Sequence, residues 1–301
     1  MEKPVIRISV RNLVEFILRN GDLESGGTAG DKEAMLKGSR LHRKIQKQMG
    51  SHYQAEVSLK KDTEYEDLIL RVEGRADGIF TQNEKICIDE IKGVYKNLEL
   101  LAEPVLVHRA QALCYAWIYL DDHGLEEIDV QMTYVHLDTE MIKRFRETMT
   151  REELESWYQR LLDSYHKWLS YQMKWREERN RSMEKLEFPF IYRKGQKEMV
   201  AGIYHAISRK EQIFIQAPTG VGKTMSAVFP AVRSIGEGKA ETLFYLTART
   251  ITRTVAQDAF EILRKNGLLF KTVTITAKEK LCFCEKPECN PETCPYAKGH
   301  Y

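Results

Sequence analysis

Apolar positions recur with helical spacing in residues 10–20 and 32–49, on either side of a glycine-rich stretch. Three runs rich in β-branched and aliphatic residues follow at 53–60, 67–80 and 85–93, separated by polar breaks. The pattern therefore predicts two opening helices and then an antiparallel meander.

The next segments return to longer periods. A helix is expected at about 105–121 and a strand at about 128–136, which would complete an α/β/α core. From 139 to about 180 charged and aromatic residues recur with helical spacing and without Gly or Pro, so we expect a closing helical segment. Residues 177–185 are the candidate linker.

Two domains are therefore expected, 1–183 and 184–301. A chain of 301 residues with 43% hydrophobic content is long enough for two cores. Residues 1–183 hold 28 Lys/Arg against 32 Asp/Glu, whereas residues 184–301 hold 18 against 12, which favours the second domain for contact with phosphates.

Targeting and membrane signals are weak in this sequence. No apolar run approaches the roughly 20 residues that a membrane span needs, and the first ten residues have Lys3 but no long apolar region. We expect a soluble cytoplasmic protein with no membrane partner.

Three charged residues of the meander suggest metal-dependent hydrolysis. Asp77 lies at the end of one predicted strand, and the next strand brings Glu90 and Lys92 to one face because side chains alternate. Two carboxylates suit Mg²⁺, and a lysine can orient a water and offset the charge of a phosphorane. Taken alone, the same residues could be a solvated strand face.

Two flanking motifs turn these residues into a family pattern. Gly38 and His42 lie on the helix before the meander, and Gln111 and Tyr115 share a face of the following helix by their i, i+4 spacing. The order GxxxH, D, ExK, QxxxY resembles the RecB-like branch of the PD-(D/E)XK nucleases over roughly residues 10–136. That fold is a mixed sheet flanked by helices.

The resemblance implies a role for each of these residues. His42, Asp77 and Glu90 would ligate Mg²⁺ or Mn²⁺, Lys92 would be the catalytic lysine, and Gln111 and Tyr115 would support the site or the DNA. His42 taken alone could instead be a partly buried helix histidine.

The chain departs from the family pattern in two places. Ala76 stands where proline is common before the aspartate, at a position that supplies no ligand. Cys87 and Cys114 sit inside predicted elements, as core residues, so we expect no iron–sulfur cluster in this domain.

A phosphate-binding loop follows in residues 211–224, EQIFIQAPTGVGKT, which combine a predicted β-run, a glycine-containing loop and a helix start. Backbone N–H groups of such a loop cradle phosphates, the lysine contacts the terminal phosphates, and the following hydroxyl helps to hold Mg²⁺. The candidate ATP-binding residues are Thr219, Gly220, Val221, Gly222, Lys223 and Thr224. The alternative is a chance Gly-Lys-Thr turn.

The loop resembles that of superfamily 2 helicases, in which Ala217 at the first glycine position is typical. The resemblance implies the start of a RecA-like P-loop domain. Residues 188–196 are similar to the adenine-recognition segment of these helicases, where Gln196 would pair with the adenine edge and Arg193 would lie beside it. Otherwise both would be ordinary surface residues.

A further helicase-like segment begins with the apolar run 242–247, which predicts a buried strand. Thr247, Arg249 and Thr250 resemble the residues with which helicases grip the DNA backbone. Capping of the following helix is the alternative role for Thr250.

Four of the six cysteines lie close together near the end of the sequence, at Cys282, Cys284, Cys289 and Cys294. In a cytosolic protein such a cluster usually binds a metal or an iron–sulfur group. The segment 278–301 resembles the iron–sulfur segment of XPD/DinG-like helicases, which implies a 4Fe-4S cluster. Zinc is the alternative, and Cys284 could be a spectator if a later cysteine is the fourth ligand.

The sequence lacks other parts of a motor. After Phe190 the only aspartate is Asp258, no Asp-Glu pair follows the loop, and we expect a truncated motor that binds nucleotide but neither hydrolyses ATP nor unwinds DNA. The parent protein would be an ATP-dependent DNA helicase with a fused nuclease, acting in repair or defence on DNA that is single-stranded or has single-stranded ends. The sequence indicates no obligate protein partner. The alternative is an inactive nuclease-like module that only binds DNA.

Overall fold

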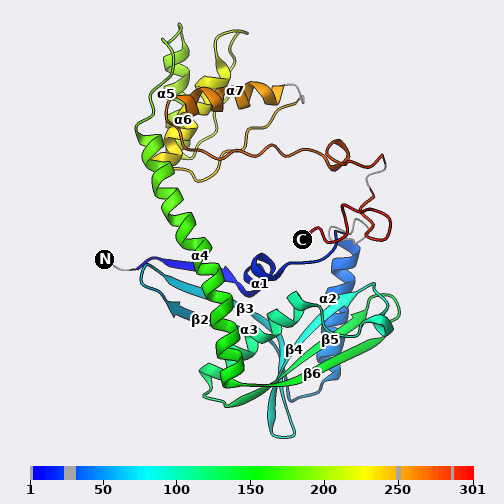
Figure 1. Cartoon of the computed structure of the whole chain (residues 1–301). Coiled ribbons are helices and arrows are strands. Elements are labelled where there is room, and N and C mark those ends of the chain that lie inside the picture. Colours follow the sequence, from blue (N-terminus) through cyan, green and yellow to red (C-terminus); the bar gives the residue numbers. More distant parts are fainter. Residues whose placement is uncertain (1–2, 24–31, 249–251, 286–287) are drawn as a thin grey trace. The chain divides into compact units, whose positions relative to one another are not determined.

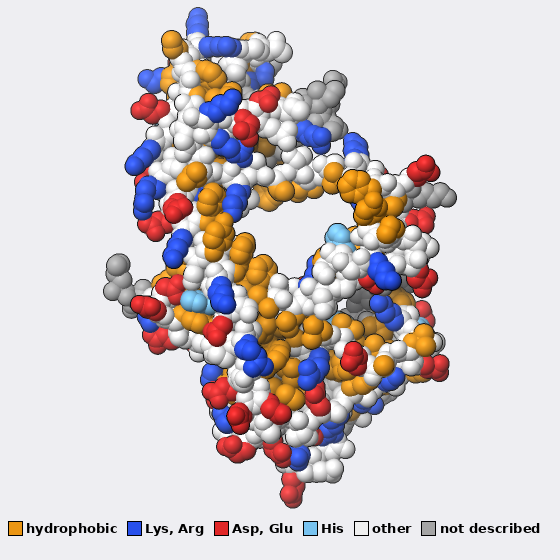
Figure 2. Space-filling view, viewed as in Figure 1, with side chains coloured by type: hydrophobic (Ala, Val, Ile, Leu, Met, Phe, Trp, Pro, Cys, Tyr) orange, Lys and Arg blue, Asp and Glu red, His pale blue; other side chains and the backbone are white. Residues whose placement is uncertain are grey.

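The computed structural model describes residues 3–23, 32–248, 252–285 and 288–301, arranged in two compact units (Figure 1). The first unit is Met1–Trp168 with Thr276–Tyr301, and the second is Leu169–Ile275. No helix in the described ranges is both long and apolar enough to cross a bilayer. Figure 2 shows acidic and basic side chains interspersed on the visible face of the first unit.

The described strands of the first unit form one mixed sheet of six strands. They are β1 (Val5–Ser9), β2 (Tyr53–Glu64), β3 (Ile69–Gln82), β4 (Lys85–Val94), β5 (Glu127–His136) and β6 (Ile142–Thr150). The order is β1-β3-β4-β5-β6, with β2 also paired to β3. The β1/β3 and β4/β5 pairs are parallel, and the other pairs are antiparallel. The mixed α/β architecture predicted for this part of the chain is confirmed.

Strand β3 meets two different neighbours along one edge. Residues 69–73 pair with β1, residues 78–82 pair with β4, and β2 runs along the other edge. Residues 74–77 therefore cross from one neighbour to the other. Asp77 ends this crossing and lies at the fork where β1 and β4 separate.

The described helices of this part are α1 (Val10–Leu18), α2 (Lys32–Gln48), α3 (Leu106–Asp122) and the first half of α4 (Arg151–Glu184), which continues into the second unit. Two of them contact opposite faces of β4. From α2, Leu41 and Ile45 pack on Ile91, whereas Lys92 points the other way and bonds to Gln111 of α3. A short 3-10 turn, η1 (Leu98–Leu100), precedes α3.

The prediction of a helix from 139 onward was wrong for its first part. Residues 142–150 form β6 and pair with β5 along the edge of the sheet. Helix α4 then begins with a capping box, in which Thr150 Oγ1 accepts from the Glu153 amide at 3.3 Å and Glu153 Oε2 accepts from the Thr150 amide at 2.9 Å. The pairing with β5 overrides the helical spacing of the charged residues.

The predicted linker at 177–185 was also wrong, because α4 continues to Glu184. Met183 is fully buried there and joins the core of the second unit. That core unites α5 (Gln196–Arg209), α6 (Lys223–Gly236) and α7 (Thr252–Lys265). A second 3-10 turn, η2 (Lys278–Lys280), precedes the cysteines in the first unit.

Neither predicted strand of the second unit forms. The described residues of 211–216 and 242–247 are in no strand, and they expose Phe214 (93%), Phe244 (74%) and Leu246 (88%). Continuous apolar runs become strands when flanking strands and covering helices bury both faces. Here the helices bury their apolar sides against one another, and the two runs have no ladder partner among the described residues.

Candidate functional sites

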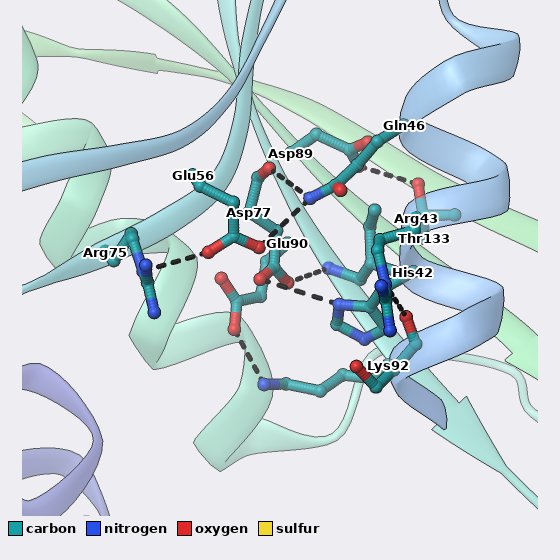
Figure 3. Close-up of polar contacts among 12 residues, drawn as sticks. His42, Arg43, Gln46, Glu56, Arg75, Asp77, Asp89, Glu90, Lys92 and Thr133 are labelled. Atoms are coloured by element: carbon teal, nitrogen blue, oxygen red, sulfur yellow. Dashed lines mark hydrogen bonds and ion pairs between the residues drawn. The ribbon is translucent and has the colours of Figure 1, made fainter. Parts of the chain in front are cut away.

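The sheet fork brings together the acidic residues predicted from the sequence (Figure 3). Asp77 accepts a hydrogen bond at Oδ2 from the Ile91 amide at 2.7 Å, which ties the end of the crossing segment to β4. Its Oδ1 lies 3.7 Å from Nδ1 of His42 on α2. The fork therefore places Asp77 between the histidine and the strand that carries Glu90.

Glu90 is 4% exposed and its two carboxylate oxygens have different surroundings. Oε1 lies 2.6 Å from Nζ of Lys92, whereas Oε2 is buried without a hydrogen-bond partner among the described residues. Lys92 also donates to Oε1 of Gln111 at 2.7 Å. Buried carboxylate oxygens are normally hydrogen-bonded, so Oε2 of Glu90 is an unusual feature of this site.

Electrostatics at the fork disfavour two bare carboxylates. Burial raises the pKa of Glu90 to about 8, with Lys92 opposing the rise and Asp77 adding to it. Burial also raises the pKa of Asp77, although His42 and the Ile91 amide oppose that rise. A divalent cation would relieve both burial costs at once.

The other predicted ligand and support residues do not all lie close to Asp77 and Glu90. Within the described part of the chain, no three His, Cys, Asp or Glu side chains are arranged as a metal site. Two carboxylates remain sufficient for Mg²⁺, which keeps several waters and uses few protein ligands. Tyr115 is buried further along α3, where a Cβ on Gly74 would lie 2.7 Å from its hydroxyl oxygen.

The residues whose hydrogen bonds support the fork were not identified from the sequence. Asp89 is fully buried and accepts hydrogen bonds from Tyr53 at 3.1 Å, Gln131 at 3.1 Å and Thr133 at 2.6 Å. Gln46 of α2 donates to the backbone oxygen of Asp77 at 2.9 Å. The sequence signal was the alternation of polar residues at 129, 131 and 133 with apolar residues in this strand.

The glycine loop of the second unit has the backbone of an anion-binding turn. Gly220 and Gly222 have φ of +81° and +79°, a region that side chains rarely adopt. Lys223 begins α6 and donates from Nζ to the carbonyl oxygens of Ala217 at 2.8 Å and Pro218 at 2.9 Å. The lysine thus folds over its own loop.

The predicted adenine-recognition residues lie against this loop. Arg193 donates from its guanidinium to the Gly220 carbonyl oxygen, and its amide donates to Oε1 of Gln196 at 3.0 Å. Gln196 is buried, and a Cβ on Gly222 would lie 2.5 Å from its Nε2. Thr224 lies 3.5 Å from the Tyr245 hydroxyl, while Thr219 is exposed and Val221 is half-buried.

The predicted DNA-gripping segment is described only in part. Thr247 is exposed and lies in a run without regular secondary structure rather than in the predicted strand. Arg249 and Thr250 lie outside the described residues.

Of the four clustered cysteines, the structure brings two into contact. Sγ of Cys284 lies 3.8 Å from Sγ of Cys294, so Cys284 is not remote from the cluster. That contact and burial raise the pKa of the Cys284 thiol to about 11. Cys282 and Cys289 are half-buried, whereas Cys87 and Cys114 are fully buried in the sheet unit, as predicted.

Comparison with known proteins bears on the second unit and on the residues that directly follow it. Residues 193–283 match the family model described as DEAD/DEAH box helicase. They form a helicase-type segment. This match implies a RecA-like fold and ATP binding for that segment, in agreement with the glycine loop.

Two further similarities are partial. The chain is 43% identical over 49 residues to the "Probable ATP-dependent helicase MJ0942" of Methanocaldococcus jannaschii, a stretch covering 16% of this chain and 7% of that relative. A solved structure described as the "Crystal structure of SSO0001" is 18% identical, with a TM-score of 0.36, over 54% of this chain and 77% of that one. The nuclease and iron–sulfur assignments stay predictions.

Proposed function

We propose that this chain joins a divalent-metal-dependent nuclease to the ATP-binding part of a helicase motor that acts on DNA. The observation that carries the nuclease is the buried Oε2 of Glu90, which has no partner among the described residues. It lies on a carboxylate whose other oxygen is held by Lys92. A structural ion pair would be expected to satisfy both oxygens, whereas a metal site leaves one free for the ion.

The donor set at the fork suits a hard cation. Asp77 and Glu90 would hold Mg²⁺ or Mn²⁺, and His42 would join them if the ion accepts nitrogen. A bound ion supplies a polarised phosphoryl oxygen and an acidified water. The chain's own contribution is to exclude bulk water from Glu90 and to fix Asp77 through the Ile91 amide.

Lys92 would act beside the ion on the scissile phosphate. Its ammonium group is anchored by Glu90 Oε1 and Gln111 Oε1, which orients it toward the fork. A fixed positive charge there favours the extra negative charge of a phosphorane transition state. Gln111 is therefore a positioning residue, and Tyr115 packs the helix that carries it.

The nucleotide site would lie at the glycine loop. The carbonyl oxygens that Lys223 contacts are weak substitutes for phosphate oxygens, so ATP would draw the ammonium away from Ala217 and Pro218. Thr219, Gly220, Val221 and Gly222 would offer amides to the phosphates, and Thr224 would help to hold Mg²⁺. Arg193 and Gln196 would border the adenine.

The cysteine segment would bind a 4Fe-4S cluster through Cys282, Cys284, Cys289 and Cys294. The 3.8 Å approach of two thiols supports a shared ligand for them. Zinc remains the competing occupant, because thiolate sites of this kind accept either. Thr247, Arg249 and Thr250 would contact the DNA backbone in the same motor.

Cleavage of labelled single-stranded DNA by the full chain with Mg²⁺ or Mn²⁺ tests the nuclease. Lys92→Ala is expected to lower the rate by about 100-fold or more, as removal of a transition-state donor does. Glu90→Gln should abolish cleavage, because it removes the charge that holds the ion. Glu66→Gln is the matched control, since Glu66 is exposed on the loop between β2 and β3.

Two outcomes would contradict the nuclease. Equal loss in Glu66→Gln would point to contamination or to a general charge effect. No cleavage by a folded, metal-supplied chain would leave a nuclease-like module that only binds DNA.

A further inference from the structure

Helix α2 carries a second set of charged residues beside the candidate nuclease site. Arg40, Arg43, Lys44 and Lys47 line a surface hollow of about 440 Å³. Their spacing of three and four residues places all four on one face of the helix. All of the described residues that line this hollow are cations, whereas the visible face of the unit mixes both signs (Figure 2).

The charges in this hollow are poorly compensated. Lys44 pairs with Glu140 across the turn before β6. Arg43 donates from Nε to the Ser39 carbonyl oxygen at 3.2 Å. In the described part of the chain, no carboxylate pairs with Arg40, Arg43 or Lys47. Like charges at these spacings destabilise a helix, so an external anion would relieve the face.

The same helix reaches the candidate active site. His42 contacts Asp77, and Gln46 donates to the backbone oxygen of Asp77. These two residues alternate in sequence with the basic residues but lie on another side of the helix. Figure 3 shows His42 reaching from α2 toward Asp77, with Arg43 on the same helix. Because His42 and Gln46 lie on another side of the helix from the basic face, a chain of anions on that face would reach the site by passing around α2.

We infer that the basic face of α2 is a track for the phosphodiester backbone of the nucleic acid that enters the nuclease site. From residue 40 to residue 47 the helix rises about 10 Å. Phosphates on one strand follow at about 3.4 Å of rise, so the face spans two or three of them. The inference rests on the proposed nuclease only for the strand's destination, because phosphate binding itself needs no catalysis.

The test compares Arg40→Gln/Lys47→Gln with the full wild-type chain. These two residues lie at the ends of the face and contact neither Asp77 nor Glu90 in the described structure. Binding of a labelled single-stranded DNA oligonucleotide is followed by fluorescence anisotropy in EDTA, without ATP, over a salt series. The slope of log Kd against log salt should fall by about 1.4, since each lost single-strand contact removes about 0.7.

The matched control is Lys60→Gln/Lys167→Gln, which neutralises two exposed lysines on β2 and α4 of the same unit. It should keep the wild-type slope. An unchanged slope in the α2 variant, or an equal fall in the control, overturns the track. Equal α2 dependence for binding of anionic phospholipid vesicles would also overturn it, in favour of a membrane surface.

Cleavage of bis(p-nitrophenyl) phosphate with Mn²⁺ separates this inference from the nuclease itself. That ester is too small to lie along α2, so the α2 variant should cleave it at the wild-type rate. If wild type fails to cleave it while the slope still falls in the α2 variant, the nuclease fails and the track stands. If wild type cleaves the ester while the slope does not change in the α2 variant, the nuclease stands and the track fails.

Discussion

Lys92 Nζ lies 2.6 Å from Oε1 of Glu90, two residues earlier on β4, and leaves Oε2 of that carboxylate buried without a partner in the described structure. One lysine therefore satisfies half of a buried acid. Burial raises the pKa of Glu90 to about 8 even with this lysine in place. The buried carboxylates of the fork are therefore only partly neutralised, as expected of a site that a bound ligand would stabilise.

Divalent ions should complete the fork and stabilise the protein. At ten times its Kd, Mn²⁺ is expected to raise the free energy of unfolding of the first unit by about 1.4 kcal/mol. Glu90→Gln should lose this gain because the variant lacks the charge that holds the ion, while Glu66→Gln should keep it. Thermal unfolding across a Mn²⁺ series measures the effect, and equal stabilisation of all three proteins would contradict the site.

The glycine loop gives a prediction with a built-in control. In Gly222→Ala the new Cβ would lie 2.5 Å from Nε2 of Gln196, at a residue with φ of +79°. Gly238→Ala meets a similar backbone penalty at φ of +73°, with nothing within 4 Å of the new Cβ. Each should cost about 1 kcal/mol of stability through the left-handed backbone.

Only the first of these variants should lose nucleotide binding. Displacement of Gln196 distorts the loop and the adenine segment together, so we expect at least about a tenfold rise in Kd, equivalent to 1.4 kcal/mol. Titration with a fluorescent ATP analogue measures it. A parallel loss in Gly238→Ala would mean that general destabilisation, rather than the loop, controls binding.

The cysteine segment predicts a coloured protein. Anaerobically isolated chain should contain iron and sulfide and show a broad visible absorption, which Cys294→Ser should lose. Cys114→Ala is the control, because Cys114 is buried alone in α3 and should keep the absorption. A colourless protein that contains stoichiometric zinc would show that the segment binds zinc instead of an iron–sulfur cluster.

Local patterns predicted most of the first unit. The predicted strand 85–93 became β4 at Lys85–Val94, and the predicted helix 32–49 became α2 at Lys32–Gln48. Both patterns are periodic over their whole length, so the sequence alone specifies them. Strand β6 was not predicted, because its outward residues are polar and its pairing with β5 is decided by the sheet. The Thr150–Glu153 capping box nevertheless marks where α4 begins.

The sequence predicted the charged residues of the candidate site but not the residues that hold them in place. Asp77, Glu90 and Lys92 could be listed from strand alternation and motif order. The partners of Asp89 lie on β2 and β5 and depend on the order and register of the strands. The bond from Gln46 depends on which helix covers which face of β4. That choice is made by packing between residues far apart in the sequence, such as Ile45 with Ile91, and leaves no local signal.

His108 should make the first unit sensitive to acid. Burial, with help from the positive charges of Lys92 and Arg11, lowers the pKa of this imidazole from 6.5 to about 3. Its Nδ1 lies 3.2 Å from the Tyr134 hydroxyl. The folded protein therefore keeps His108 neutral at pH values where the unfolded chain binds a proton.

The direction in which stability changes with pH follows from that difference in bound protons. Stability from a neutral His108 is complete above about pH 6.5 and falls as the pH drops toward 3, by about 1.4 kcal/mol per unit. At pH 5 the loss relative to pH 7 should be about 2 kcal/mol. His108→Gln should remove this component, whereas His123→Gln, at an exposed residue that ends α3, should retain it.

Urea unfolding of the three proteins from pH 7 to pH 4, followed by tryptophan fluorescence, measures the prediction. The buried carboxyls of the fork titrate in every variant, so the informative quantity is the difference between wild type and His108→Gln. That difference should grow in favour of the variant as the pH falls, because the wild type alone must protonate a buried imidazole or unfold. A difference independent of pH would mean that His108 is already charged in the folded protein or exposed to water.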